Sequence, residues 1–197
     1  MILTQNEIPE YLQASPVSRF LMRPRRKPVQ GRSGAQIKSG ALLEQVLAAS
    51  AQFPVDAKAL REHMTEASRR IFQAGVAGVL IQDQQGYGLS AVSPSGKEDT
   101  ADASLLSHAR SFAAQAVESK RLVNFRFSYR DSGGDEKIYC GLAQPLLTAK
   151  SASALLVVRR AVFSPAEVSV FHVFGTLARM ALENAELWVS TPASRTA

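Results

Sequence analysis

Hydrophobic residues recur at helical spacing in the stretch from residue 41 to residue 71. Leu43, Val46 and Leu47 share one helical face, which predicts a first amphipathic helix over residues 41–53. A second helix is expected to begin after Asp56, because an aspartate there can accept a hydrogen bond from an unpaired amide of the first turn. The second helix carries one continuous apolar stripe: Leu60, Met64, Ala67 and Ile71.

After Gly75 the pattern changes to a nearly continuous apolar run. Val76–Asp83 is rich in β-branched residues, and a run of this kind predicts a strand that is buried on both faces. The segment 84–86 is typical of a turn, so Tyr87–Ser93 is expected to return antiparallel to the first strand. These residues therefore predict a β-hairpin in the central part of a sheet.

A third helix and three further strands are predicted in the second half of the chain. Residues 100–120 predict the helix, whose apolar face consists of Leu105, Ala109, Phe112 and Ala116. Residues 122–129 alternate between apolar and polar side chains, which is the period of a strand with one buried face. Two more strands are predicted over residues 137–147 and 153–159, after the glycine-rich loop 131–135.

The segment Ser164-Pro165-Ala166-Glu167 is the sharpest local signal in the chain. It is a capping box, in which the hydroxyl and the carboxylate each serve one unpaired backbone amide. Its proline occupies the first helical position, where the missing N–H does no harm. The helix that begins here is predicted to run to about Val189.

The order of the predicted elements indicates the fold class. Two helices, two strands, a helix, three strands and a helix form an α+β arrangement with an antiparallel sheet. A chain of 197 residues is long enough for one domain with a substantial core. We expect residues 41–189 to form this domain and residues 190–197 to form a short C-terminal tail.

Residues 1–40 differ in composition and are expected to form a basic, flexible N-terminal arm. Four prolines interrupt any helix there, and the arm holds most of the net charge of +6. Its basic cluster of Arg23, Arg25, Arg26 and Lys27 favours nucleic acid or an acidic surface as one alternative partner. An apolar island precedes the cluster and suits folding upon a partner: Val17, Phe20, Leu21 and Met22. The other interpretation is an unstructured solubilising tail.

Residue types that form catalytic or metal sites are sparse. Cys140 is the only cysteine, which excludes an internal disulfide, and we expect it to be a small buried hydrophobe in a strand. The three histidines lie far apart in predicted helices. Neither a membrane span nor a secretory signal is apparent. We therefore expect a cytoplasmic protein that is not an enzyme and holds no metal and no cofactor.

Several segments resemble the GAF domain family. Phe163–Glu167 and Ala181–Leu187 resemble the capped start and the Glu-Asn-Ala ending of the last GAF helix. Val79–Asp83, Gln144–Leu146 and Ala154–Val158 resemble three GAF strands. The resemblance implies an antiparallel sheet of five or six strands, with the terminal helices on one face and a helix plus loops on the other.

The resemblance also implies a place for a ligand. GAF domains that bind a small molecule hold it between one sheet face and the helix and loops on that face. Here the cleft would include Tyr87, Arg110, Phe125, Arg126 and Tyr139. The arginines would meet an anionic group and the rings would stack on a nucleotide or a similar ligand. The alternative is that the aromatic stripe is core and the arginines are solvated.

GAF domains often pair through their first and last helices, so the resemblance implies a homodimer. The implied interface consists of Leu43, Val46, Leu47, Leu177, Leu182, Leu187 and Trp188. The leading hypothesis is a non-catalytic regulatory module that acts in signalling by dimerisation and by protein–protein interaction, through these helices or the arm. A small-molecule or second-messenger sensor is the alternative. The methionine sulfoxide reductases of GAF fold rely on several cysteines, and this chain has one.

Overall fold

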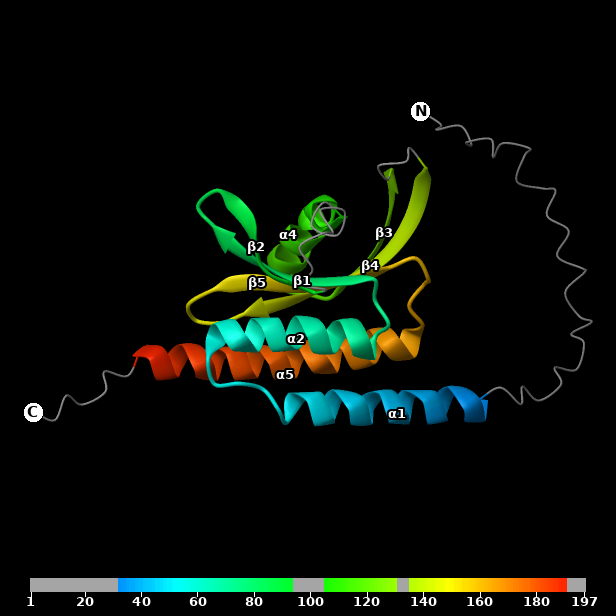
Figure 1. Cartoon of the computed structure of the whole chain (residues 1–197), viewed down its shortest axis with the longest axis horizontal. Helices are drawn as coiled ribbons and strands as arrows, with labels where there is room; N and C mark the ends of the chain where they lie inside the picture. Colours follow the sequence, from blue (N-terminus) through cyan, green and yellow to red (C-terminus); the bar gives the residue numbers. More distant parts are fainter. Residues whose placement is uncertain (1–31, 94–104, 131–134, 191–197) are drawn as a thin grey trace, which may run out of the picture.

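Five antiparallel strands form one sheet in the order β2-β1-β5-β4-β3 (Figure 1). The structure is a computed structural model, and it describes residues 32–93, 105–130 and 135–190. The strands are β1 (Val76–Asp83), β2 (Gly86–Ser93), β3 (Val123–Arg130), β4 (Glu136–Leu147) and β5 (Ala152–Arg159). Each neighbouring pair is antiparallel, which confirms the predicted α+β class and the five-stranded form of the sheet.

β1 is buried because it has a strand on each side and helices on both faces. Its first five residues are buried, and the polar residues Gln82 and Asp83 at its end are exposed, as the sequence predicts. Its pairing with β2 contains a β-bulge, since Val79 pairs with Ala91 whereas Leu80 pairs with Leu89. The extra residue lies on β2, which is an edge strand.

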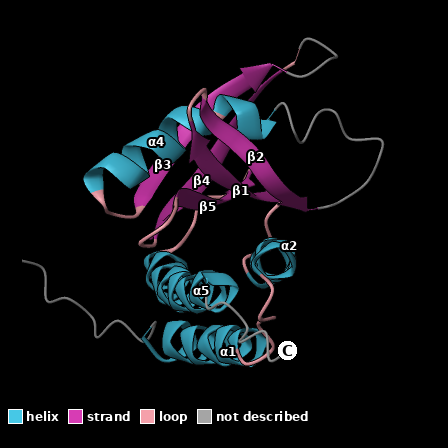
Figure 2. Ribbon diagram, turned by 90° about the vertical axis from the view of Figure 1, so that its left-hand side faces the viewer, coloured by secondary structure: helices cyan, strands magenta, loops and turns pink. Residues whose placement is uncertain are grey.

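Helices cover both faces of the sheet (Figure 2). α2 (Ala57–Ile71) and α5 (Pro165–Ser190) pack on one face, and α4 (Arg110–Ser119) packs on the other. α1 (Arg32–Ser50) lies outside α2 and α5 and packs mainly on α5, so it forms a third layer. The terminal helices therefore lie on one side of the sheet and α4 on the other, as expected.

The sheet separates two hydrophobic clusters. The cluster under α2 and α5 includes the fully buried rings of Phe72, Phe171 and Phe174. Burial of such a side chain stabilises the fold by about 1.5–3 kcal/mol. The cluster under α4 includes Leu106 and the β3 residue Phe125. Cys140 belongs to the first cluster and is buried, which confirms its predicted place in the core.

Two predicted helix starts can be compared with the structure. The side chain of Asp56 accepts a hydrogen bond of 2.8 Å from the Ala59 amide, which confirms the cap of α2. α1 begins at Arg32, earlier than the predicted start at residue 41. The segment 32–40 contains glycines, which weaken a helix, but no proline, which would stop it.

Two predicted helix borders differ from the structure. α2 ends at Ile71, before Gly75, because Gln73 takes a left-handed backbone conformation with φ of 48°. A turn at Ala109 separates α4 from a helical stretch at residues 105–108. The predicted start of this helix at residue 100 lies outside the described residues.

Candidate interaction surface and ligand cleft

The start of α5 is fixed by the predicted capping box. The Ser164 amide donates to Glu167 Oε2 at 2.7 Å, and the Glu167 amide donates to Ser164 Oγ at 3.3 Å. Arg159 at the end of β5 forms an ion pair with Glu167 at 2.8 Å. Burial raises the pKa of Glu167, but hydrogen bonds from Arg159 and Ser164 outweigh burial and hold this pKa below its usual value. The predicted cap is therefore confirmed, and the Arg159–Glu167 ion pair links it to the end of β5.

Gly175 lets α5 approach the sheet closely. A Cβ atom at this position would lie 2.1 Å from Cγ of Gln144, a buried residue of β4. The Oε1 atom of Gln144 lies 3.0 Å from Nδ1 of His172, one turn earlier on α5. Because Phe171 and Phe174 fill the core on either side, the rotation of α5 about its axis is fixed. This rotation decides which α5 residues face outward.

An apolar stripe remains exposed along α5. Val173, Met180 and Leu187 recur every seven residues and are exposed to 40%, 51% and 53%. Leu177 and Asn184 lie between them, which completes the alternating spacing of four and three residues found on a coiled-coil seam. Asn184 is exposed and Leu177 is half-buried. We refer to these five residues as the α5 stripe.

α1 adds further exposed apolar residues. Leu43 and Leu47 are exposed to 37% and 51%, whereas Val46 between them is fully buried against the core. Leu182 on α5 is also fully buried, and Trp188 near the end of α5 is 72% exposed.

Of the seven interface residues that the sequence implies, Val46 and Leu182 are therefore core residues. The apolar pattern of each helix identified both residues, but it could not show which of its sides faces the protein's own core.

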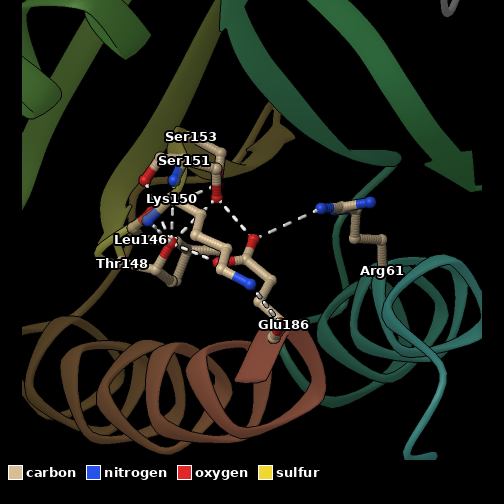
Figure 3. A network of polar contacts seen from close by, with 7 residues as sticks. All are labelled: Arg61, Leu146, Thr148, Lys150, Ser151, Ser153 and Glu186. Atoms are coloured by element: carbon tan, nitrogen blue, oxygen red, sulfur yellow. Dashed lines mark hydrogen bonds and ion pairs between the residues drawn. The ribbon is translucent and has the colours of Figure 1, made fainter. Parts of the chain in front are cut away.

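Glu186 joins the C-terminal part of α5 to α2 and to the turn between β4 and β5 (Figure 3). Thr148 Oγ1 donates to Glu186 Oε2 at 2.5 Å, and Ser151 Oγ donates to Oε1 at 2.6 Å. Arg61 of α2 lies 3.7 Å from Oε1, and Lys150 Nζ donates to the backbone carbonyl of Glu186 at 2.7 Å. The next residue in the chain belongs to the α5 stripe, so this network fixes the end of the stripe.

Three of the five predicted ligand residues lie on the sheet face that α4 covers. Phe125 is buried and stacks on Phe112 of α4, with ring centroids 4.2 Å apart. Tyr139 is half-buried, 5.9 Å from the ring of Phe127, and Tyr87 packs against the same cluster. Phe125 is thus a core residue, as the alternative interpretation of the aromatic stripe predicted, while the two tyrosines are partly accessible.

The two arginines occupy different places. Arg126 pairs with Cys140, whose side chain lies in the cluster under α2 and α5. Successive strand residues point to opposite faces, so Arg126 is exposed on the face opposite to Phe125. Arg110 is the first residue of α4 and is also exposed. The structure therefore does not bring Arg126 into the cleft with the aromatic rings.

A cavity of about 400 Å³ lies beside Tyr139, with Leu105, Arg159 and Arg160 among its lining residues. The guanidinium of Arg160 lies 5.9 Å from the Tyr139 ring centroid. Arg159 lines the cavity too, but it already donates to backbone carbonyls and to a carboxylate. Arg160 is therefore the cation available to an anionic ligand. The sequence did not single it out, because its position beside Tyr139 depends on the pairing of β4 with β5.

The basic cluster Arg23, Arg25, Arg26 and Lys27 lies outside the described residues. Within residues 32–93, 105–130 and 135–190, no group of three or more His, Cys, Asp or Glu residues is placed to hold a metal ion. In the same ranges no helix is long and apolar enough to cross a bilayer.

Comparison with known proteins identifies the fold. No protein-family model matches the chain, and no curated protein matches its sequence. The chain is similar in structure to the GAF domain of a phosphoenolpyruvate-protein phosphotransferase from Coxiella burnetii, with a TM-score of 0.54 and 11% identity. This match covers 78% of the present chain and 97% of the other.

Two further neighbours show how differently the same fold is used. A phycoerythrobilin-bound GAF domain from a cyanobacterial phytochrome matches with a TM-score of 0.51 and 11% identity, over 77% of this chain and 97% of that one. Free methionine-R-sulfoxide reductase from Neisseria meningitidis, in complex with its substrate, matches with a TM-score of 0.51 and 12% identity, over 76% and 91%. The chain thus has a GAF-like fold, and the fold alone does not choose between a regulatory and an enzymatic role.

Proposed function

We propose that this chain is a non-catalytic GAF-like regulatory module, which acts in signalling by pairing with a second copy through α1 and α5. The observation that carries this proposal is the α5 stripe, because it leaves large apolar side chains in water along one side of a terminal helix. A contiguous exposed apolar surface of this kind is typical of an interaction site.

The spacing of the α5 stripe favours a second copy of the same helix as the partner. In a parallel two-stranded coiled coil, residues at alternating intervals of three and four meet their equivalents across the two-fold axis. Asn184 would occupy one of these positions, where a single asparagine favours a defined register. Leu43 and Leu47 are exposed apolar residues on α1, which packs along α5.

The residues with catalytic potential are engaged in structural contacts, which supports a non-catalytic role. Cys140 is buried, so its thiol is not accessible to a substrate. His63 lies 3.3 Å from the carbonyl of Ala49, and His172 pairs with Gln144. His108 contacts the ring of Tyr129, with ring centroids 4.9 Å apart.

Sedimentation velocity of the full chain over a range of concentrations tests the proposed pairing. We expect a concentration-dependent dimer, and we expect Met180→Glu to weaken it by about tenfold or more, because the substitution places a charge at the centre of an apolar interface. Val162→Glu is the matched control, because Val162 is also an exposed apolar residue but belongs to the loop that connects β5 to α5. A wild-type chain that stays monomeric, or a dimer that Met180→Glu leaves intact, contradicts the proposal.

A second candidate function is suggested by the cavity beside Tyr139 and Arg160. An aromatic wall with one available guanidinium fits a small anionic ligand that carries a ring, such as a nucleotide. Titration of the ¹⁵N-labelled protein with a panel of nucleotides and aromatic carboxylates would show shifts of the residues that line the cavity. Arg160→Gln should remove the response, while Arg126→Gln on the opposite face should retain it. Unchanged spectra across the panel would exclude this candidate for the ligands tested.

A further inference from the structure

A groove runs between α2 and the outer edge of β2. It has a volume of about 680 Å³ and is lined by Glu62 and Glu66 of α2 and by residues 89–93 of β2. Among the strands that the structure describes, β2 is the outermost on its side of the sheet. The backbone N–H and C=O groups on its outer side are therefore available to a further extended segment.

The helical wall of the groove is acidic. Glu66 accepts hydrogen bonds from Arg69 and Ser93 and pairs with Arg70 at 3.3 Å, so its charge is balanced by α2 itself. Glu62 is exposed, and its carboxylate has no hydrogen bond or ion pair among the described residues. The groove thus offers one uncompensated negative charge to an incoming cation.

The strand side of the groove is partly apolar. Leu89 is 38% exposed and lies on the α4 side of the sheet, where it approaches Gly78 of β1. Ala91 and Ser93 lie on the other side, towards α2. An added strand would therefore meet an apolar residue on one face and a glutamate on the other, which requires alternating apolar and basic residues.

The chain itself contains such a segment outside the described residues. Residues 17–23, Val-Ser-Arg-Phe-Leu-Met-Arg, lie between two prolines and contain none, so every backbone N–H can donate to a neighbouring strand. In an extended conformation both arginines share one face with Val17 and Leu21, and Phe20 and Met22 share the other face with Ser18. We propose that this segment of the N-terminal arm binds in the groove of its own chain as an added strand on β2, with Arg19 or Arg23 facing Glu62.

The length of chain between the segment and α1 permits this placement. Leu42 of α1 and Ile71 of α2 line one shared cavity, so the N-terminal half of α1 lies beside the end of α2. From the helical rise, Arg32 lies about 23 Å along the helix axes from Glu66. The nine Cα–Cα steps from Arg23 to Arg32 span up to about 31 Å when extended, which leaves about 20 Å for the sideways offset of the groove from α1, or about two helix-packing distances. The two prolines among residues 24–31 favour an extended form.

Paramagnetic broadening in the full chain tests the proposal. Gln85→Cys places a nitroxide label in the exposed turn between β1 and β2, outside the groove, and the buried Cys140 does not compete for the label. We expect the amide signals of residues 17–23 to broaden far more than those of residues 2–6. Glu62→Lys should weaken the equilibrium constant for docking of the arm by up to about fivefold, the upper value for one exposed ion pair, and should reduce this excess broadening accordingly.

Glu44→Lys is the matched control, because Glu44 is an equally exposed glutamate on α1 and should leave the broadening unchanged. The proposal is overturned if the arm broadens uniformly, if it does not broaden, or if Glu62→Lys has no effect. It is also overturned if broadening appears when spin-labelled ¹⁴N protein is mixed with unlabelled ¹⁵N protein, since the arm would then bind a partner copy. The Met180→Glu variant should retain the broadening, which separates this test from that of the α1–α5 pairing.

Discussion

Substitution of Gly175 by alanine tests whether the seating of α5 on β4 is as close as the structure indicates. In an exposed helix, Gly→Ala stabilises a protein by up to about 1 kcal/mol, because alanine restricts the unfolded chain and favours the helix. At position 175 the new Cβ would lie 2.1 Å from Gln144 Cγ and 3.0 Å from its Cδ. The two side chains cannot occupy these positions together, so either Gln144 or α5 must move.

The expected magnitude follows from two destabilising contributions and one stabilising contribution. Overpacking of a core costs about 1–3 kcal/mol, and loss of the partly buried Gln144–His172 hydrogen bond costs about 1 kcal/mol. Helix propensity returns up to about 1 kcal/mol. We therefore expect Gly175→Ala to destabilise the protein by about 1–3 kcal/mol, measured as the free energy of unfolding in urea.

Two comparisons make the test specific. Gly40→Ala in α1 is the matched control, because nothing lies within 4 Å of its Cβ position, and it should be stabilising. In a Gln144→Ala background the Cγ and Cδ atoms are gone, so Gly175→Ala should cost less by about 1 kcal/mol or more. The reasoning is refuted if Gly175→Ala stabilises the protein as Gly40→Ala does, or if the cost is the same in both backgrounds.

Three further predictions concern the ends of helices. Glu186→Ala should destabilise the protein by about 1–3 kcal/mol in urea and should accelerate amide exchange in the last turns of α5, since Thr148 and Ser151 lose their acceptor. The pKa of Glu167 is lower in the folded than in the unfolded chain, so its stabilising contribution is present above the unfolded pKa and is lost as the pH falls through the folded value. The melting temperature of Glu167→Gln should therefore fall less on acidification than that of the wild type. An identical acid dependence of the two proteins would contradict this. Lys120→Gly should stabilise the protein by about 0.5 kcal/mol, because Lys120 ends α4 with a φ of 55°, and a melting temperature that falls instead would argue against the left-handed cap.

The order of the elements and several of their ends could be predicted from the sequence, because local signals specify them. The cap by Asp56 and the capping box of Ser164 and Glu167 depend on residues at most three positions apart. The buried run of β1 and the alternation along β3 are also local patterns. The start of α1 could not be predicted, because glycines in the segment 32–40 weaken a helix without excluding it.

Contacts between distant segments could not be predicted in the same way. Glu186 and Thr148 are 38 residues apart, and only the packing of α5 over the β4–β5 turn brings them together. Periodicity likewise found both apolar sides of α5 but could not assign Leu182 to the core. For Arg126, by contrast, the local pattern was sufficient. Strand alternation places this residue on the face opposite to Phe125, and therefore outside the cleft.

The third-layer position of α1 has a consequence for how the molecule opens. α1 packs mainly on α5, and among its described side chains Val46 alone is fully buried, so its removal uncovers one side of a single core cluster and leaves the cluster under α4 untouched. Its release therefore requires only a fraction of the free energy of global unfolding. We therefore expect α1 to be an independent unit of local unfolding, with amide protons that form an exchange class faster than those of α5 or β5. A partner that holds α1 in place would slow this class alone, so the helix can report an association event without any change in the sheet.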